Sequence, residues 1–188
     1  MKKQFIIGLL PLLSFITQSA HSDTHKLTKE ARVIAQQFQG QLKPELKKGL
    51  QKGGPVHAIE VCHTKAPQIA HKLSQKTGWK INRVSLKSRG ANATPDLWER
   101  TVLTSFNSKL ADGANIKTLE QGAIIEVGGQ KTFRYMKAIP TGDVCLKCHG
   151  TKVSENVKQA LHKLYPNDQA TGFSKGQIRG AFSFQKAL

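Results

Sequence analysis

The segment AIIEVGGQKTFRYMKAI, residues 123–139, decides the fold class that the sequence predicts. Its two halves, 123–127 and 132–139, are rich in β-branched and aromatic residues, which favour strands. Gly128, Gly129 and Gln130 separate them, and glycine readily adopts the backbone conformations of a tight turn. The segment is therefore predicted to be a β-hairpin, which places an antiparallel sheet in the second half of the chain.

Two amphipathic helices are predicted to precede this hairpin. Apolar residues recur at steps of three and four over 27–52 and again over 56–76, with polar residues on the other side. A Gly-Gly-Pro sequence at 53–55 separates the two segments. Pro44 and Pro67 lie inside them and are expected to kink the helices that contain them.

The remaining elements lie between and after these segments. They are predicted as strands over 79–86 and 177–185, helices over 96–110 and 154–164, and a glycine-bearing loop over 87–93. Thr94 is the expected N-cap of the helix at 96–110, with Pro95 in its first position. Helices first and an antiparallel set of strands later predict an α+β fold with one domain over 23–188.

A cysteine-rich pentapeptide, Cys145-Leu146-Lys147-Cys148-His149, follows the hairpin in a segment expected to be a loop. Each of the two thiols can add across a vinyl group of haem, and the histidine after them then lies under the iron. The motif predicts one covalently attached haem c, with His149 as an iron ligand. A redox-active C-x-x-C pair and half of a zinc site are the alternatives. Zinc needs four ligands, however, and the chain has no second C-x-x-C.

The first 22 residues predict export from the cytoplasm. Lys2 and Lys3 are followed by an apolar run over 5–16, which is shorter than the roughly 20 residues that span a bilayer. Such a run suits a signal peptide, and small residues at Ala20 and Ser22 mark the expected cleavage region. Residues 1–22 are therefore predicted to be a signal peptide and the mature chain to be periplasmic, without a transmembrane segment. An uncleaved N-terminal anchor is the alternative.

The chain is strongly basic, with a formal net charge of +17. Loss of Lys2 and Lys3 would lower this charge to +15, and two haem propionates would lower it further to about +13. Predicted export and an aromatic content of only 6% argue against nucleic acid as a partner. An acidic redox partner protein, a membrane sensor or an anionic membrane surface is expected instead. A solvated basic surface with no specific partner is the alternative.

A third cysteine, Cys62, would remain after the haem has used the other two. On the helix predicted over 56–76 it shares a stripe with other apolar residues, so it is expected to face the core. An unpaired thiol in an oxidising compartment is either buried and inert or bound to something.

Short sequence signatures extend along the whole mature chain. They are IEVC at 59–62, AP at 66–67, IA at 69–70, RVSLK at 83–87, Asn92, PD at 95–96, WE at 98–99, CLKCHG at 145–150, YP at 165–166 and RGA at 179–181. On these signatures the chain resembles a family of small exported monohaem c-type proteins with a PAS-like fold and a cyanobacterial representative, long described as a domain of unknown function. It departs from the family at Arg89-Gly90-Ala91, where Arg-Asn-Pro is usual.

The resemblance implies how the haem iron is held. By position, His149 is the proximal ligand and the thiolate of Cys62 is the distal one. Other residues that could serve as the distal ligand are His57, His63, His71 and Met136. Met136 is expected instead to pack against the porphyrin. Candidates for contacts with the haem propionates are Arg83, Arg134 and Tyr135.

This ligand pair favours some functions over others. A thiolate opposite a histidine favours ferric iron and a low potential. Redox sensing, gas sensing or low-potential one-electron transfer is therefore predicted, and reduction is expected to protonate or displace Cys62. The alternative is a haem enzyme, peroxidase-like or nitrite-handling, with an open distal site. Enzymatic activity is less expected because the sequence places no distal acid–base pair.

Overall fold

The structure is a computed structural model that describes residues 17–188. Most of the predicted signal peptide, residues 1–16, lies outside the described residues. Within the described range, no helix combines the length and the apolar character that crossing a membrane requires.

The first element, α1 (Thr17–Thr77), contains both helices that were predicted before the hairpin. Its backbone departs from helical angles only at Gly53 and at Gly54, which has φ 67° and ψ −161°. The chain thus divides at the predicted glycines rather than at Pro44 or Pro67. Gly54 lies in the positive-φ region, where a residue without a Cβ atom is favoured.

A four-stranded antiparallel sheet forms the centre of the molecule. Its strands are β1 (Lys80–Val84), β2 (Glu120–Val127), β3 (Gln130–Pro140) and β4 (Ile178–Ala187). They lie in the order β1-β4-β3-β2, so the last strand pairs with both the first and the third. The predicted α+β, PAS-like fold, with helices before an antiparallel sheet, is confirmed.

The predicted hairpin is formed by β2 and β3. Its turn is shorter than expected, because Gln130 already pairs with Val127 and only Gly128 and Gly129 connect the strands. Both glycines have positive φ angles, 58° and 79°. Two successive positive angles define the turn that matches the twist of a two-residue hairpin.

Two further helices, α2 (Leu97–Ala111) and α4 (Glu155–Leu164), lie close to their predicted positions. The predicted cap of α2 is wrong: Asp96, not Thr94, is the N-cap, and Pro95 precedes it. The Asp96 carboxylate accepts from the Glu99 amide at 2.9 Å, and the Glu99 carboxylate accepts from the Asp96 amide at 2.8 Å. This reciprocal pair satisfies two amides at once, which a threonine at position 94 cannot do.

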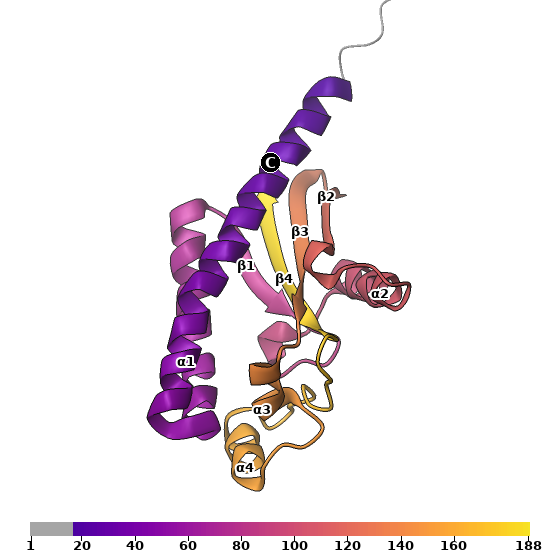
Figure 1. Cartoon of the computed structure of the whole chain (residues 1–188). Coiled ribbons are helices and arrows are strands. Elements are labelled where there is room, and N and C mark those ends of the chain that lie inside the picture. The colour runs from indigo at the N-terminus through magenta and orange to yellow at the C-terminus, as the bar shows by residue number, and fades with distance from the viewer. Residues whose placement is uncertain (1–16) are drawn as a thin grey trace, which may run out of the picture.

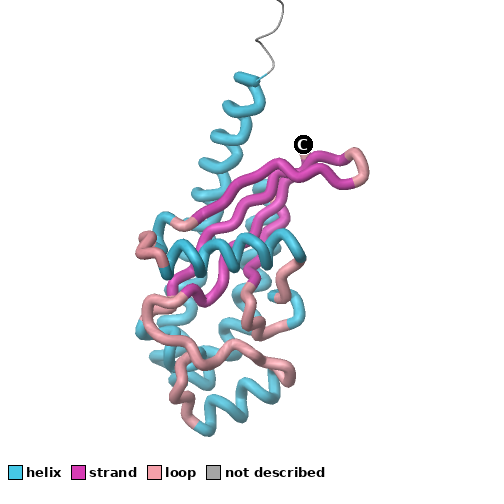
Figure 2. Tube along the Cα trace, turned by 90° about the vertical axis from the view of Figure 1, so that its right-hand side faces the viewer, coloured by secondary structure: helices cyan, strands magenta, loops and turns pink. Residues whose placement is uncertain are grey.

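The sheet is covered on both faces, α1 lying against one and α2 against the other (Figure 1). Under α1 lies the larger cluster, which includes Phe38, Trp79 and Phe182. Under α2 lies a second cluster, which includes Leu103, Phe106 and Met136. The longer loops and α4 gather at the end of the sheet away from the β2–β3 turn (Figure 2). That end carries the C-x-x-C-H motif.

A buried glycine at this end of the sheet gives a prediction about stability. A Cβ atom on Gly180 of β4 would lie 2.4 Å from the Val84 carbonyl oxygen, in a backbone contact that cannot relax cheaply. Gly180→Ala is expected to lower the free energy of unfolding by about 2 kcal/mol in urea titrations. The matched control is Gly40→Ala in α1, where no atom lies within 4 Å of the added carbon. That variant should be up to about 1 kcal/mol more stable, and equal stability of the two variants would contradict the predicted clash.

A second prediction concerns acid stability. Glu120 of β2 accepts hydrogen bonds from Arg32 of α1 at 2.8 Å and from the Tyr135 hydroxyl at 2.8 Å. Burial alone would raise the pKa of Glu120, but these hydrogen bonds and the charges of Arg32 and Lys137 outweigh it and lower the pKa below 4.5. A carboxylate with a lowered folded pKa stabilises the fold above its unfolded pKa, and this stability is lost as the pH falls through the folded pKa.

Glu120→Gln is therefore expected to cost on the order of 2 kcal/mol at pH 7. Its stability should also fall less steeply than that of the wild type between pH 5 and 3. The free energy of unfolding, measured across this range, checks both expectations. Parallel curves for the two proteins would show that Glu120 does not carry the acid sensitivity.

Candidate functional site

Three loops meet at the end of the sheet and form the candidate site. They are the loop after β1, the segment after β3 that contains the motif, and the loop between α4 and β4. The third loop is bonded to the motif, because the Phe173 amide donates to the His149 carbonyl at 2.9 Å and the Gly172 amide to the Gly150 carbonyl at 3.0 Å. It is also bonded to the first loop, from Gln169 to the Ser88 carbonyl at 2.9 Å. The motif is thus held between two loops far apart in the sequence.

The motif itself is helical, so the prediction that it lies in a loop is wrong. A 3₁₀ turn at Asp143–Cys145 leads directly into α3 (Leu146–His149). Gly150 ends this turn by donating to the Leu146 carbonyl at 3.0 Å, and a Cβ atom there would lie only 2.6 Å from that oxygen. Residues three apart on a helix lie on the same side, so the fold presents the two thiols together.

All three cysteines of the chain are free and half-buried in this region. Cys62, on the second half of α1, lies near Cys145 and Cys148, and these thiols influence one another's pKa values. Burial raises the pKa of Cys62 and, likewise, that of Cys148. The structure thus brings the predicted distal ligand to the predicted attachment site, although the two lie more than 80 residues apart in the sequence.

His149 is held as a neutral imidazole in which one ring nitrogen, Nδ1, carries the proton. Its Nδ1 lies 2.6 Å from the Ala170 carbonyl oxygen, which can only accept, so Nδ1 carries the proton. Burial first, and then the charges of Arg179 and Arg89, lower the pKa of His149 to about 2. Arg179 Nε lies 3.0 Å from Nδ1 and 3.3 Å from Nε2, and Arg89 Nη1 lies 3.5 Å from Nε2. With Nδ1 protonated, the Nε2 lone pair is the acceptor that faces these two guanidinium groups. This is the tautomer in which a histidine binds a metal through Nε2.

Three arginines, Arg83, Arg89 and Arg179, surround these groups and make the site electropositive. Burial lowers the pKa of Arg83, and it lowers that of Arg179 to about 10. Only Arg89 has a carboxylate partner among the described residues, Asp168 at 3.0 Å. Arg179 donates to the Ser85 hydroxyl at 2.9 Å, and Arg83 lies over the Phe38 ring at 5.2 Å. These neutral partners do not balance the charges, so both arginines suit an anionic ligand.

An apolar wall completes the site. Ile59 of α1 packs with Val157 and Leu161 of α4, and Cys148 and Tyr165 lie against this cluster. The Tyr165 ring also meets the His63 ring edge-on, with their centroids 5.1 Å apart. Apolar walls beside cationic groups fit a planar, largely apolar ligand with acidic substituents, which is the chemistry of haem with its propionates.

Several residues predicted for this site lie elsewhere. Met136 is fully buried under α2, and not with the residues that surround the motif. Arg134 pairs with Asp96 at 2.7 Å and lies over the Trp98 ring. Tyr135 donates to Glu120 under α1. Each of these side chains is occupied by the packing of its own strand, so of the three candidates for propionate contacts only Arg83 lies at the site.

The histidines named as rival distal ligands are also placed by the structure. His71 and His63 are exposed, and His57 lies 3.4 Å from Glu60 on the same helix. Cys62 is the member of this group whose charge interacts with both motif cysteines.

No sequence pattern predicted a role at the site for Arg89, Arg179, Asp168 or Ala170. Arg179 and Arg89 were visible in the sequence, the first in the R-G-A signature and the second in the loop that departs from the family. Asp168 and Ala170 carried no motif at all. Ala170 contacts His149, and Asp168 holds Ala170, only because the loop after α4 folds back, which no local pattern reveals.

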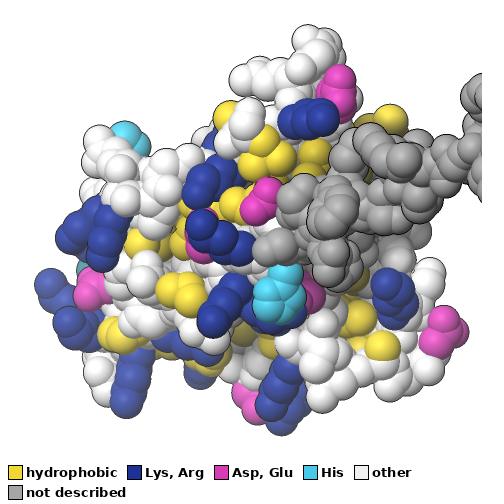
Figure 3. All heavy atoms as spheres, turned by 90° about the horizontal axis from the view of Figure 1, so that it is seen from above, with side chains coloured by type: hydrophobic (Ala, Val, Ile, Leu, Met, Phe, Trp, Pro, Cys, Tyr) yellow, Lys and Arg dark blue, Asp and Glu magenta, His cyan; other side chains and the backbone are white. Residues whose placement is uncertain are grey.

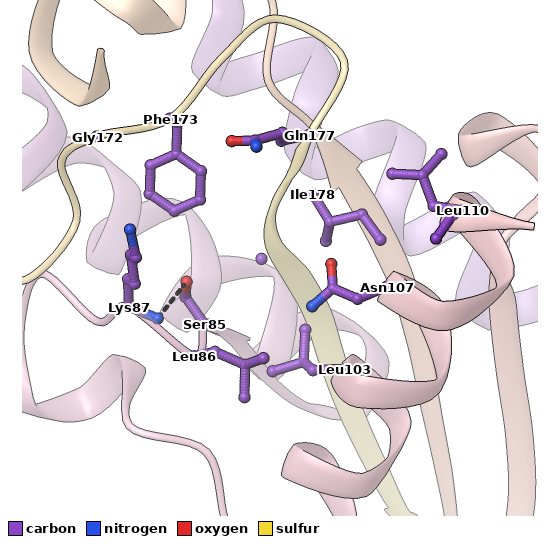
Figure 4. Close-up of a pocket in the computed structure, with 12 residues that line it drawn as sticks. Ser85, Leu86, Lys87, Leu103, Asn107, Leu110, Gly172, Phe173, Gln177 and Ile178 are labelled. Atoms are coloured by element: carbon purple, nitrogen blue, oxygen red, sulfur yellow. Dashed lines mark hydrogen bonds between the residues drawn. The ribbon is translucent and has the colours of Figure 1, made fainter. Parts of the chain in front are cut away.

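A pocket of about 430 Å³ is lined by Phe173 and residues of α2 and of the loops after β1 and α4 (Figure 4). Leu103 and Asn107 of α2 form one wall, and Lys87 and Gln177 contribute polar groups. The Phe173 ring lies edge-on to His149 with centroids 6.3 Å apart, so the same residue lines the pocket and contacts the histidine of the motif.

The basic charge of the chain does not form one patch on the face seen in Figure 3. Lysine and arginine side chains are distributed across that face, with a few acidic side chains between them.

The fold and the site define a class: a small α+β protein that presents C-x-x-C-H beside a third thiol at one end of an antiparallel sheet. Among the described residues, no cluster of three or more His, Cys, Asp and Glu side chains could hold a metal ion by itself. Residues 16–186 match the model of the Tll0287-like family, Tll0287, and the chain belongs to this family.

One solved structure is similar over nearly the whole chain, the crystal structure of the cyanobacterial haem protein Tll0287. The two chains are 22% identical and superpose with a TM-score of 0.62, over 89% of this chain and 96% of that one. At this identity the likeness shows the fold. No curated protein matches the chain.

Proposed function

We propose that this chain is an exported monohaem c-type protein that holds its haem through Cys145 and Cys148, with His149 and Cys62 as axial ligands. One observation carries the proposal: Cys62 of α1 lies near the thiols of Cys145 and Cys148, and His149, which follows them at the end of α3, is a neutral imidazole whose Nδ1 proton is already engaged. The haem protein Tll0287, with the same fold, supports it.

The protein groups fit covalent attachment. Each thiol adds its S–H across a vinyl C=C bond, sulfur bonding to one carbon and hydrogen to the other, so no electron acceptor is needed. This addition requires both thiols reduced and on one side of the chain, as the turn of α3 presents them. Gly150 permits that tight turn, and the loop after α4 holds it in place.

The cationic side chains of the site have a corresponding role. Arg83 and Arg179 lack a carboxylate partner among the described side chains, and both have lowered pKa values because they are buried. Two propionates would neutralise them, and a charge-assisted hydrogen bond of this kind is stronger than a neutral one. The bound haem would supply one-electron chemistry, while these arginines and the apolar wall fix its orientation.

Ligation by histidine and thiolate favours the ferric state and a low potential. We therefore propose redox or gas sensing, or low-potential one-electron transfer in the periplasm, as the role of the protein. The basic surface would favour an acidic redox partner or a membrane sensor protein.

A haem enzyme with an open distal site is the alternative. It would require Cys62 to be off the iron and a distal acid–base group in its place. His63 follows Cys62 directly but is exposed and packs edge-on against Tyr165. An exposed His63 supports the haem-enzyme alternative only weakly. The position of Cys62 near the motif gives stronger support to ligation by His149 and Cys62.

The test is the ferric electron paramagnetic resonance (EPR) spectrum of the full chain, produced with a c-type maturation system and purified from the periplasm. An alkaline pyridine spectrum should first show one haem c per chain. A low-spin signal with the narrow g-spread of thiolate ligation is then expected. A high-spin signal would contradict the Cys62 ligand and favour the enzyme, and a colourless protein would contradict haem binding itself.

A further inference from the structure

A buried carboxylate outside the predicted ligand set is linked to His149 by a short chain of hydrogen bonds. Asp168 lies in the loop after α4, and its side chain is only 9% exposed. Its Oδ1 accepts from the Ala170 amide at 2.8 Å. The carbonyl of the same Ala170 accepts the Nδ1 proton of His149 at 2.6 Å. The carboxylate thus holds the residue whose carbonyl orients the imidazole.

Arg89 connects the same carboxylate to the motif. Its Nε lies 3.1 Å from both oxygens of Asp168, and one terminal nitrogen donates to the Cys148 carbonyl at 2.6 Å. That nitrogen also lies 3.3 Å from the Ala170 carbonyl. Asp168 and Arg89 therefore tie the loop after α4 to the motif through the Cys148 and Ala170 carbonyls, next to His149.

From this geometry we infer that Asp168 is a positioning residue that fixes the hydrogen bond between His149 Nδ1 and the Ala170 carbonyl. The inference deepens the proposed function, on which it rests, because this bond governs how strongly the imidazole donates electrons to a metal. A firmly held Nδ1 proton gives the ring more imidazolate character and makes it a more basic ligand. The ferric state is then stabilised further and the potential is lowered.

The comparison uses two variants and a matched control in the full haem-loaded chain. Asp168→Asn keeps the shape and an acceptor for the Ala170 amide but loses the charge paired with Arg89. Asp168→Ala loses both the acceptor and the charge. If Asp168→Ala does not fold, Asp168→Asn alone is sufficient to test the inference. The control, Glu155→Gln, also removes one carboxylate from an ion pair, with Lys158, but that pair is exposed and lies on α4.

Both Asp168 variants are expected to have a more positive midpoint potential than the wild type, together with altered ferric EPR g-values. Exchange of the His149 ring proton with solvent, followed by NMR, should be about tenfold faster. Glu155→Gln should match the wild type in all three measurements. If the Asp168 variants melt at a lower temperature but keep the wild-type potential and g-values, Asp168 only stabilises the fold and the inference is overturned. Variants that match the wild type in all three measurements would also overturn it.

Failure of the proposed function is recognised separately. If the wild type purifies without haem, the proposed function is wrong. The His149 ring proton is then compared by ¹⁵N NMR in that same haem-free protein. Faster exchange in Asp168→Asn than in Glu155→Gln would still support positioning by Asp168, and equal exchange would overturn it.

Discussion

Replacement of both Cys145 and Cys148 by alanine is expected to abolish covalent haem attachment completely. Each thiol forms one thioether, so removal of both leaves no bond between chain and porphyrin. The measurement is the mass of the intact denatured protein, which should fall from chain plus one haem to chain alone. Acid–acetone should then extract any pigment that remains with the protein. Either single variant should retain one thioether and its haem.

Cys62→Ala is the matched control for this experiment. Cys62 is also a half-buried free thiol close to the motif, but it lies on α1 and outside the pentapeptide. This variant should therefore keep its covalent haem. Loss of attachment in Cys62→Ala would show that the distant thiol takes part in attachment, contrary to the proposal. Persistence of covalent haem in the double variant would show that Cys145 and Cys148 are not the attachment residues.

The second large effect is expected from the same Cys62→Ala variant, at the iron. Removal of the thiolate should convert the narrow low-spin ferric signal to a high-spin one. It should also raise the midpoint potential by on the order of 100 mV or more, because axial ligands set haem potentials over a wide range. EPR and a spectroelectrochemical titration measure the two changes. The reduced variant should bind carbon monoxide without displacement of a sulfur ligand.

His63→Ala provides the matched control for the distal ligand. His63 is adjacent to Cys62 on α1 but is exposed. Its substitution should leave the ferric spectrum and the potential unchanged. If the ferric EPR spectrum changed in His63→Ala but not in Cys62→Ala, His63 and not Cys62 would be the group at the distal side of the iron. That result would favour the haem enzyme.

Local patterns predicted much of the secondary structure. The Gly-Gly-Pro break, the hairpin and α4 lie where the spacing of apolar residues and the turn residues place them. The cap of α2 was misplaced because Thr94, Pro95 and Asp96 all suit a helix start. Only the backbone decides which side chain reaches the free amides. The motif was expected in a loop because a helix of one turn has no periodicity to detect.

Some residues of the candidate site could likewise be predicted from the sequence, and others could not. A chemical requirement with fixed spacing makes Cys145, Cys148 and His149 recognisable from the sequence, and Cys62 was singled out as the remaining thiol. Arg134 and Met136 were equally plausible from the sequence but are used by the packing of α2. A strand residue points to one face or the other, and which element covers that face is a tertiary property.

The sequence by itself determined the fold class, and it predicts an export signal and a haem attachment motif, because each of these depends on residue types at short, fixed separations. The tertiary structure decided which groups surround His149. Asp168, Ala170 and Arg89 reach it only because the loops after β1 and α4 fold back onto the motif. The contacts of His149 with Ala170 and with Arg89 join residues 21 and 60 positions apart. Their formation depends on chain folding and burial, for which no local sequence pattern exists.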